Sequence, residues 1–343
     1  MSINIFAQKP EAIQSALKGK FADFRYKQFA DWFYKKLVFD PNEATNLPKD
    51  FRDYISGLYS WQLPKIDLSF CAPDQTTKYR LKLEDDSKIE MVLIPAENKR
   101  TLCVSSQVGC ARGCSFCATG TMGIKRNLHS HEIVGQIMLA ARLTLPHRLS
   151  NLVFMGMGEP MDNLDTVLES LAIIQSPMGL AFSPRRTTVS TCGIPKGIIR
   201  LADSGIRTKL AVSLNSAIDE KRNRLMPVNR RHPLSELKEA LRYYLSKTSF
   251  RVTFEYIMIP EVNMGYEDIK ALRRFAGDLS CKVNFIPYNT VPQLPYRSPS
   301  KNEIDLFMAK AQSLNQAVTL RRSRGAEIYG ACGQLAGYQG EIE

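Results

Sequence analysis

Apolar and aromatic residues recur at helical spacing over the first part of the chain, up to about Ser60. Phe24, Phe29, Trp32 and Phe33 follow this spacing, and lysines and arginines lie between them. The pattern predicts a small helical bundle with an aromatic core. We assign residues 1–60 to an N-terminal helical accessory domain, whose mixture of aromatic and basic residues suggests nucleic-acid binding.

Alternating spacing replaces helical spacing in the next segment. Tyr79–Leu83 alternates polar and apolar residues, Glu84–Ser87 has the composition of a turn, and Ile89–Ile94 alternates again. Two alternating segments joined by a short polar turn are typical of a β-hairpin. We expect residues 61–98 to form a β-hairpin extension that links the helical segment to the rest of the chain.

Short apolar runs alternate with amphipathic stretches beyond residue 98. The runs expected to be strands are Leu152–Met155, Thr187–Ser190, Lys209–Leu214, Val252–Ile257, Val283–Pro287 and Val318–Arg321. The stretches expected to be helices are His131–Leu143, Leu164–Gln175, Leu234–Ser246, Tyr266–Leu279 and Glu303–Asn315. Repeated strand–helix units predict an α/β domain over residues 99–343, with a parallel sheet that is open or closed into a full or partial barrel. In such folds the chemistry gathers at the C-terminal ends of the strands.

The composition is that of a folded protein. The 343 residues are 44% hydrophobic and 23% charged, which excludes a disordered, collagen-like or coiled-coil chain. The first residues lack the apolar stretch of a signal peptide, and no apolar run approaches the ~18 residues of a membrane-spanning helix. We therefore expect a cytoplasmic protein that does not associate with membranes.

The net charge of +12 is concentrated in two stretches. Residues 181–231 contain eleven Lys and Arg against three acidic residues, and residues 100–148 contain six against one. A concentrated basic excess indicates a polyanionic partner, with RNA and DNA as first candidates, although a merely solvated surface would explain the charge equally well.

Three cysteines in one short segment are the most specific feature of the sequence. Cys110, Cys114 and Cys117 form a C-x3-C-x2-C pattern, and Gly109 and Gly113 give the backbone freedom to wrap around a bound centre. Eight cysteines in a reducing compartment favour metal binding or catalysis over a disulfide framework. A 4Fe–4S cluster normally takes four cysteines, so three can hold it and leave one iron open to the amino and carboxylate groups of S-adenosylmethionine (SAM).

A zinc site is the alternative for these cysteines. Structural zinc takes four ligands, usually as two separated pairs. Cys103, His129 or His131 could supply the missing ligand, but no second pair follows downstream. The pattern therefore favours the cluster.

The segments around the cysteines resemble a known family. The three-cysteine loop followed by Ala118–Gly120 is similar to that of radical SAM enzymes, and Thr101–Cys110, Phe154–Pro160 and Ala331–Leu335 resemble the RlmN/Cfr family of RNA methyltransferases, its RlmN members most of all. This resemblance implies a partial (β/α)6-type radical SAM barrel that carries the small N-terminal helical domain and the β-hairpin extension. It also implies a 4Fe–4S cluster on the three cysteines and two SAM molecules per turnover.

A SAM-binding site is implied by the same resemblance. Gly158 and Glu159 match the motif that places a glutamate against the amino group of SAM, a charge-assisted hydrogen bond. Further matches to the family's SAM pocket follow the later predicted strands: Ser190, Ser213, Leu214, Asn215 and Asn289. The family commonly has histidine at the position of Asn215, and asparagine can hydrogen-bond but cannot titrate.

Three residues match the positions that carry the family's reaction: Cys332, Cys103 and Glu90. By resemblance, Cys332 is methylated on sulfur, and a radical formed from a second SAM abstracts hydrogen from this methyl group. The carbon radical then adds to carbon 2 of adenine, which is too electron-poor to attack SAM as a nucleophile. Cys103 attacks Cys332 and leaves a disulfide for an external reductant. Glu90 matches the proposed proton acceptor, although a strand glutamate that faces solvent is an equal expectation.

The resemblance implies methylation of carbon 2 of adenine in 23S rRNA, and in tRNA beside the anticodon, by a monomer that needs an external electron donor. Carbon 8, the Cfr product, is the alternative within the family, and Glu159–Pro160 and Arg251–Tyr288 favour carbon 2. A non-catalytic, zinc-stabilised RNA-binding protein and a redox protein acting through Cys103 and Cys332 are alternatives from other classes.

One departure from the family is the loop Gly325–Gly330, which lacks the usual Asp pair and final Ala, so we expect its packing to differ. The remaining cysteines that need an interpretation are taken as core residues: Cys71, Cys192 and Cys281.

Overall fold

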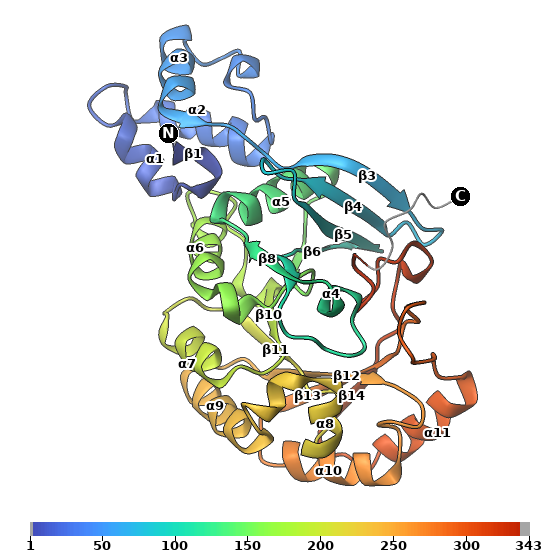
Figure 1. The fold of residues 1–343 in the computed structure, drawn as a ribbon. Coiled ribbons are helices and arrows are strands. Elements are labelled where there is room, and N and C mark those ends of the chain that lie inside the picture. The colour runs from blue at the N-terminus through green and yellow to red at the C-terminus, as the bar shows by residue number, and fades with distance from the viewer. Residues whose placement is uncertain (1–2, 337–343) are drawn as a thin grey trace.

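One mixed sheet of ten strands organises residues 3–336, the part of the chain that this computed structural model describes (Figure 1). Its parallel strands are β6 (Lys99–Cys103), β9 (Asn151–Phe154), β10 (Thr187–Thr191), β11 (Lys209–Ser213), β12 (Val252–Met258), β13 (Cys281–Pro287) and β14 (Ala317–Leu320). Their spatial order follows their order in the chain, and within residues 3–336 no pairing closes the sheet between its end strands β14 and β3. The expected α/β architecture is confirmed.

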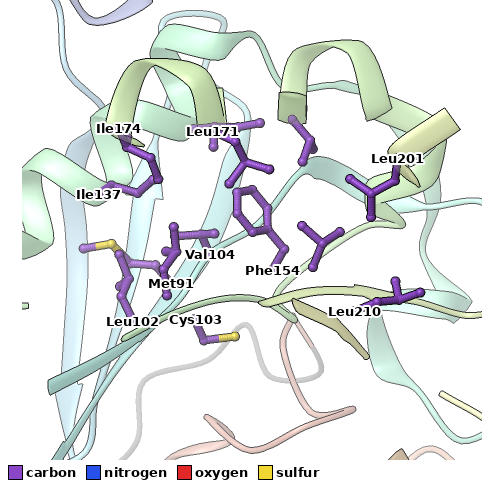
Figure 2. Packing of buried hydrophobic residues seen from close by; sticks show 14 of the residues in the cluster. Met91, Leu102, Cys103, Val104, Ile137, Phe154, Leu171, Ile174, Leu201 and Leu210 are labelled. Carbon is purple, nitrogen blue, oxygen red and sulfur yellow. The ribbon is translucent and has the colours of Figure 1, made fainter. Parts of the chain in front are cut away.

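Helices connect the parallel strands. They are α5 (Ser130–Leu143), α6 (Leu164–Gln175), α7 (Pro195–Asp203), α8 (Asp219–Leu225), α9 (Leu234–Lys247), α10 (Tyr266–Ala276) and α11 (Lys301–Ala311), with 3-10 turns at Pro160–Asn163, Pro184–Arg186 and Pro227–Arg230. Figure 2 shows Ile137 of α5 and Leu171 and Ile174 of α6 on the side of the sheet to which Phe154 points. Cys103 of β6 points to the other side (Figure 2). Apolar packing therefore fixes one face of the sheet and leaves the other face for the site.

The strand and helix predictions beyond residue 98 are confirmed, with element ends shifted by a few residues. Two helices, α7 and α8, are not among the predictions, and neither is the four-residue helix α4 (Ala118–Thr121) in the cysteine loop. In α8 six of the seven residues are polar, and α7 is only nine residues long. Neither is long enough to show the repeated apolar spacing by which a helix is found in a sequence.

Three antiparallel strands continue the sheet at β6. They are β5 (Lys88–Ala96), β4 (Thr77–Lys82) and β3 (Lys65–Cys71). The expected hairpin is confirmed as β4 and β5, whereas β3 is an addition, because its residues are exposed or half-buried throughout and give no apolar alternation. Since β5 pairs with β6, the hairpin and the parallel strands share one sheet, and the division at residues 61–98 and 99–343 stays a prediction.

Short helices form the N-terminal segment. They are α1 (Pro10–Leu17), α2 (Phe24–Ala30), a π-helical turn (Asp31–Lys35), α3 (Lys49–Leu58) and 3-10 turns at Ile5–Ala7 and Pro41–Glu43, with a two-residue pairing of β1 (Ile3–Asn4) and β2 (Tyr59–Ser60). Phe29 and Phe33 stack with ring centroids 5.3 Å apart and are buried, which confirms the aromatic core. Phe24 is wrong as a core residue: it is 51% exposed, because it begins α2 outside the buried face of that helix. RNA binding by residues 1–60 stays a prediction. No helix within residues 3–336 is long and apolar enough to cross a bilayer.

Candidate active site

The three-cysteine loop lies between two short strands, β7 (Gln107–Cys110) and β8 (Gly123–Asn127), which form a small sheet of their own. Gly109 has φ +79° and Gly113 has φ +63°, which confirms that the loop uses the freedom of glycine. A Cβ on Gly109 would lie 2.0 Å from the carbonyl oxygen of Gly123, so only glycine allows β7 and β8 to approach this closely.

The cysteines of this loop line one cavity at the C-terminal ends of the parallel strands. Cys110, Cys114 and Cys117 are free thiols. Burial raises the pKa of Cys110 to about 11 and also raises the pKa of Cys114 and of Cys117, so a centre that binds there must displace their protons. The cavity encloses about 900 Å³ of empty space, part of which is open to solvent.

The donor set fits an iron–sulfur cluster better than a zinc ion. Each thiolate of a 4Fe–4S cluster binds a different iron, so the sulfurs surround the centre instead of converging on one point. Within residues 3–336 no three His, Cys, Asp or Glu side chains converge closely enough to hold a single metal ion. Cys103 lines no part of this cavity, and His129 and His131 stack on each other at the start of α5. The side chains considered for completing a zinc site are therefore elsewhere.

Gly158 and Glu159 line the same cavity, shortly after β9. Glu159 is 4% exposed, and its carboxylate accepts hydrogen bonds from the backbone N–H groups of Met161 at 3.0 Å and Cys192 at 2.7 Å. Burial raises the pKa of Glu159, and these N–H groups oppose the rise. Gly158 has φ +99°, and a Cβ there would lie 2.5 Å from the side chain of Gln107. The carboxylate is thus fixed in the wall with lone pairs left for an amino group of a ligand.

The other residues matched to a SAM site divide into two groups. Ser190, Ser213 and Asn215 line the cavity. Ser190 lies within β10 and Ser213 is the last residue of β11, so only Asn215 follows its strand. Leu214 is fully buried in the hydrophobic core, and Asn289 lies outside the cavity lining. The Asn289 amide instead donates to the carbonyl oxygen of Cys332 at 3.2 Å and to Ser323 Oγ at 2.9 Å.

Asn215 is held by hydrogen bonds on both sides of its amide. Its Oδ1 accepts from the backbone N–H of Ile257 at 2.9 Å, and its Nδ2 lies 3.3 Å from the sulfur of Met226. Its backbone has φ +56°, and its carbonyl oxygen accepts from Asn263 Nδ2 at 2.7 Å. Asparagine therefore acts here as a connector between the ends of β11 and β12.

A buried arginine that the sequence gives no reason to select joins two of these strand ends. Arg222 is fully buried, and its guanidinium donates to the carbonyl oxygens of Cys192 at 2.5 Å and Leu214 at 3.1 Å. It also donates to Asn229 Oδ1 at 2.7 Å. Arg222 thus fixes the segments after β10 and β11 that form the cavity wall.

The loop that carries Cys332 touches the three-cysteine loop directly. The backbone N–H of Ala118 donates to the carbonyl oxygen of Gly333 at 2.8 Å, and Thr119 Oγ1 donates to that of Leu335 at 2.8 Å. These contacts join two segments that are far apart in the sequence. They place Cys332 in the lining of the cavity that the three cysteines share.

The departure just before Cys332 folds into a short 3-10 turn (Ala326–Ile328). Gly325 and Tyr329 flank it in the left-handed region, at φ +66° and +52°. The backbone N–H of Gly330 closes the turn by donating to the carbonyl oxygen of Gly325 at 2.8 Å.

A second cavity adjoins the first and contains both predicted reaction cysteines, Cys103 and Cys332. The two cavities share Met155, Arg321, Cys332 and Leu335 in their walls. Burial raises the pKa of Cys103 to about 12, and nearby Arg321 opposes the rise. The fold therefore brings Cys103 and Cys332 into one cavity, with Cys332 at the boundary between the two.

Glu90 is buried, so the alternative in which it faces solvent is wrong. Only 4% of the residue is exposed, because the end of the Cys332 segment covers this part of β5. Glu90 Oε2 accepts from the backbone N–H of Ala336 at 2.8 Å, and Oε1 lies 3.4 Å from Lys78 Nζ. Glu90 lines neither cavity, but the segment that it holds does.

Sequence reasoning missed three charged residues of the first cavity wall: Arg112, Glu255 and Arg321. Glu255 Oε2 lies 3.7 Å from Arg321 Nη1, and both line the first cavity. A lone glutamate within the apolar run of β12 is the signal that could have found it. Of the cysteines interpreted as core, Cys192 and Cys281 are buried, with Cys192 in the cavity wall, whereas Cys71 is exposed at the end of the partly exposed strand β3.

Comparison with known proteins places this site in a family. Residues 104–276 match the model of the radical SAM superfamily. The chain is 41% identical over 335 residues to a protein of Dictyoglomus thermophilum named probable dual-specificity RNA methyltransferase RlmN, covering 97% of this chain and 96% of that one. It is 43% identical over 333 residues to the dual-specificity RNA methyltransferase RlmN of Pelobacter propionicus, covering 95% and 93%.

A solved structure agrees with these matches. The crystal structure of a radical SAM methyltransferase from Sphaerobacter thermophilus superimposes with a TM-score of 0.92 at 37% identity, covering 98% of this chain and all of that one. Radical SAM enzymes use a 4Fe–4S cluster and SAM, and the three thiols and Glu159 in one cavity suit that pair. The chain belongs to the radical SAM superfamily and, within it, to the RlmN family of SAM-dependent RNA methyltransferases.

Proposed function

We propose that this enzyme methylates carbon 2 of adenine in 23S rRNA, and in tRNA beside the anticodon, with Cys332 as the carrier of the methyl carbon. The observation that carries the proposal is the position of Cys332, in the walls of both the three-cysteine cavity and the Cys103 cavity. A sulfur at this boundary can receive a methyl group on one side and deliver it to a base on the other. The dual specificity in the names of the relatives supports an RNA substrate of two kinds.

The walls of the first cavity would bind and orient SAM. Cys110, Cys114 and Cys117 would hold the cluster, which would supply the electron for cleavage of SAM into methionine and a 5′-deoxyadenosyl radical. Glu159 would accept a hydrogen bond from the amino group of SAM, since its carboxylate is buried and fixed. Ser190 would offer a hydroxyl to the same ligand.

Cys332 would first take a methyl group by polar displacement. Its sulfur forms the new S–CH3 bond, the bond from the methyl group to the SAM sulfonium breaks, and S-adenosylhomocysteine leaves with the bonding pair. The radical from a second SAM then removes a hydrogen atom from this methyl group, and the resulting carbon radical adds to carbon 2. That carbon lies between two ring nitrogens, so it accepts a radical although it is too electron-poor to attack SAM.

Release of the product would need Glu90 and Cys103. The carbon 2 proton passes to Glu90, and the Cys103 thiolate forms a bond to the sulfur of Cys332. The bond from that sulfur to the methylene carbon breaks, and this carbon keeps the electron pair and takes a proton to become the methyl group. The unpaired electron of the adduct leaves to a one-electron acceptor, and an external dithiol reduces the Cys103–Cys332 disulfide.

The test is anaerobic turnover of the reconstituted monomeric enzyme with SAM, an electron donor, and either a 23S rRNA fragment or tRNA. Nucleoside mass spectrometry should find 2-methyladenosine in both RNAs. We expect Cys332→Ala to abolish methylation of the RNA and of the protein while its iron content stays normal. Cys71→Ala removes an exposed thiol outside the site and is the matched control, with unchanged activity.

Four results would contradict the proposal in different ways. A product methylated at carbon 8 would assign the Cfr activity instead. Protein that binds zinc in place of iron and acts as a passive RNA-binding protein would reject radical chemistry. RNA methylation that survives in Cys332→Ala would reject the role of Cys332 as carrier, and dithiol turnover without SAM would favour the redox reading.

A further inference from the structure

A buried ion pair joins the two strands of the hairpin outside both cavities. Lys78 Nζ on β4 lies 3.4 Å from Glu90 Oε1 on β5, and the two side chains are only 1% and 5% exposed. Lys78 Nζ has no hydrogen-bond partner with good geometry among the described residues. Burying two opposite charges is costly unless they act on each other, and removing one leaves the other uncompensated.

The strand register places this pair on the face of the sheet where the reaction is proposed. Lys78 is paired with Val92, and Val92 with Cys103, so these three residues form one row across β4, β5 and β6. Paired residues point to the same face, and Glu90 shares that face with Val92 because side chains alternate along β5. Lys78 therefore stands about 10 Å from Cys103, two strand spacings away on the same face.

The second oxygen of Glu90 reaches the segment that carries Cys332. Glu90 Oε2 accepts a hydrogen bond from the backbone N–H of Ala336 at 2.8 Å. Leu335, the preceding residue, lines both cavities. Glu90 thus lies between Lys78 on one side and the wall of the proposed reaction site on the other.

Few other charges act on Glu90. On β4, Arg80 is its directly paired residue, but its guanidinium is taken by Asp67 of β3 at 2.6 Å. On β6 the nearest titratable group is Cys103, and the C-terminal segment contributes the N–H of Ala336. Burial raises the pKa of Glu90, and Lys78 is the first of the groups that oppose this rise.

We propose that Lys78 is a positioning residue that keeps Glu90 ionised, so that Glu90 can take the carbon 2 proton from the protein–RNA adduct; this inference rests on the proposed function. The proton moves from carbon 2 to the Glu90 carboxylate, and the electron pair of the C–H bond stays on the ring. Burial lowers the pKa of Lys78, and the Glu90 carboxylate is the first group that opposes this fall, so each charge of the pair supports the other. Without Lys78, burial would raise the pKa of Glu90 further, so a larger share of Glu90 would be protonated and unable to accept the proton.

The test follows release of the adduct in single turnovers of the reconstituted holoenzyme from about pH 6.5 to about pH 9. The variants are Lys78→Met, Lys78→Arg, Glu90→Gln and, as matched control, Lys82→Met. Lys82 lies on the same strand and pairs with Asp86 at 2.7 Å on the surface, so its removal also deletes an ion pair of the hairpin. A denaturing gel measures the covalent adduct, and mass spectrometry measures the S-methyl group on Cys332.

We expect Lys78→Met to methylate Cys332 as the wild type does and then to accumulate adduct. Its release rate at neutral pH should fall about tenfold for each pH unit by which ionisation of Glu90 is displaced upward. The ratio of its rate to the wild-type rate should rise toward one as the pH rises, because Glu90 then ionises without help. Taking the ratio removes the pH dependence of Cys103, which both proteins share. Lys78→Arg and Lys82→Met should release adduct normally, and Glu90→Gln should be slow at every pH.

Adduct release by Lys78→Met that is normal at every pH, or slowed by the same factor at every pH, would overturn the inference. Lys78→Gln is the second neutral variant and replaces Lys78→Met if that protein fails to methylate Cys332. If Glu90→Gln releases adduct as fast as the wild type, Glu90 is not the proton acceptor and the inference fails with it. If no adduct forms even in Cys103→Ala, the proposed function itself is wrong.

Discussion

Arg321 is the charged side chain that the two cavities share. It lies at the end of β14, and its guanidinium is 3.7 Å from the carboxylate of Glu255. The pKa of Arg321 is raised, first by the nearby Cys332 sulfur and then by Glu255. Arg321 is thus the cation beside Cys332, the sulfur that attacks SAM in the proposed reaction.

We predict that Arg321→Met slows methylation of Cys332 about tenfold or more, because the sulfur that attacks SAM then lacks a neighbouring cation. Arg321→Lys should recover part of the rate. The measurement is the rate at which labelled methyl from SAM enters the protein before RNA is added. Arg322→Met is the control, since Arg322 is the exposed neighbour. Equal rates for Arg321→Met and wild type would show that Arg321 does not act on Cys332.

At the scale of elements, two glycines with the same left-handed backbone lie at the base of the cysteine loop, Gly109 in β7 and Gly123 at the start of β8. Gly109 has φ +79° and Gly123 has φ +71°. A Cβ on Gly109 would meet a backbone oxygen at 2.0 Å, whereas a Cβ on Gly123 would meet nothing within 4 Å. An alanine held in the left-handed backbone conformation costs about 1–2 kcal/mol of stability at either position. The two substitutions therefore differ only in the contact that the added Cβ makes.

We predict that Gly109→Ala loses most of its iron after reconstitution, because β7 must move away from β8 and carries Cys110 with it. Gly123→Ala should keep its iron and lose only a little thermal stability. Iron and sulfide analysis, with the visible absorbance of the cluster, measures the difference. Equal iron contents in the two variants would mean that the spacing of β7 and β8 does not hold the loop.

The elements that could be predicted from the sequence are those whose signal is local. The apolar runs of β9 to β14 and the periodic helices between them are such signals, and so is the C-x3-C-x2-C loop. The burial of Glu90 could not be predicted, because the alternation in β4 and β5 indicates one exposed face. That face is covered by Ala336, which is 246 residues away in the sequence. The pairing of Arg321 with Glu255 could not be predicted either, because β13 lies between β12 and the end of β14 and the two side chains meet only in the folded sheet.

At the scale of the whole molecule, less of the net charge of +12 is available to bind RNA than the two basic stretches suggest. Arg222 is fully buried and holds strand ends. Arg112 is paired with Asp162, and Arg126 with both Asp85 and Glu132. Part of the basic excess is therefore structural, and an RNA contact has to be sought among arginines that stay exposed beside the reaction site.

Arg322 and Arg324 are exposed residues that line the Cys103 cavity, where the target base would enter. Arg324 donates a hydrogen bond to the carbonyl oxygen of Pro95, so its guanidinium also has a structural partner. Arg322 is therefore the better candidate for a phosphate contact. A splayed-out base needs its flanking phosphates held close to the cavity mouth, and an arginine there supplies both charge and hydrogen bonds.

We predict that Arg322→Ala weakens RNA binding and reduces the slope of log affinity against log salt by about 0.7, the contribution of one phosphate contact to a single strand. Arg274→Ala removes one exposed charge from α10, away from both cavities, and is the control for net charge. Fluorescence titration of the cluster-loaded protein with an rRNA fragment at several salt concentrations gives both slopes. Because long-range attraction depends on total charge, it would change both variants equally; only a direct phosphate contact changes the slope of Arg322→Ala alone. Equal slopes would therefore place the RNA backbone elsewhere on the protein.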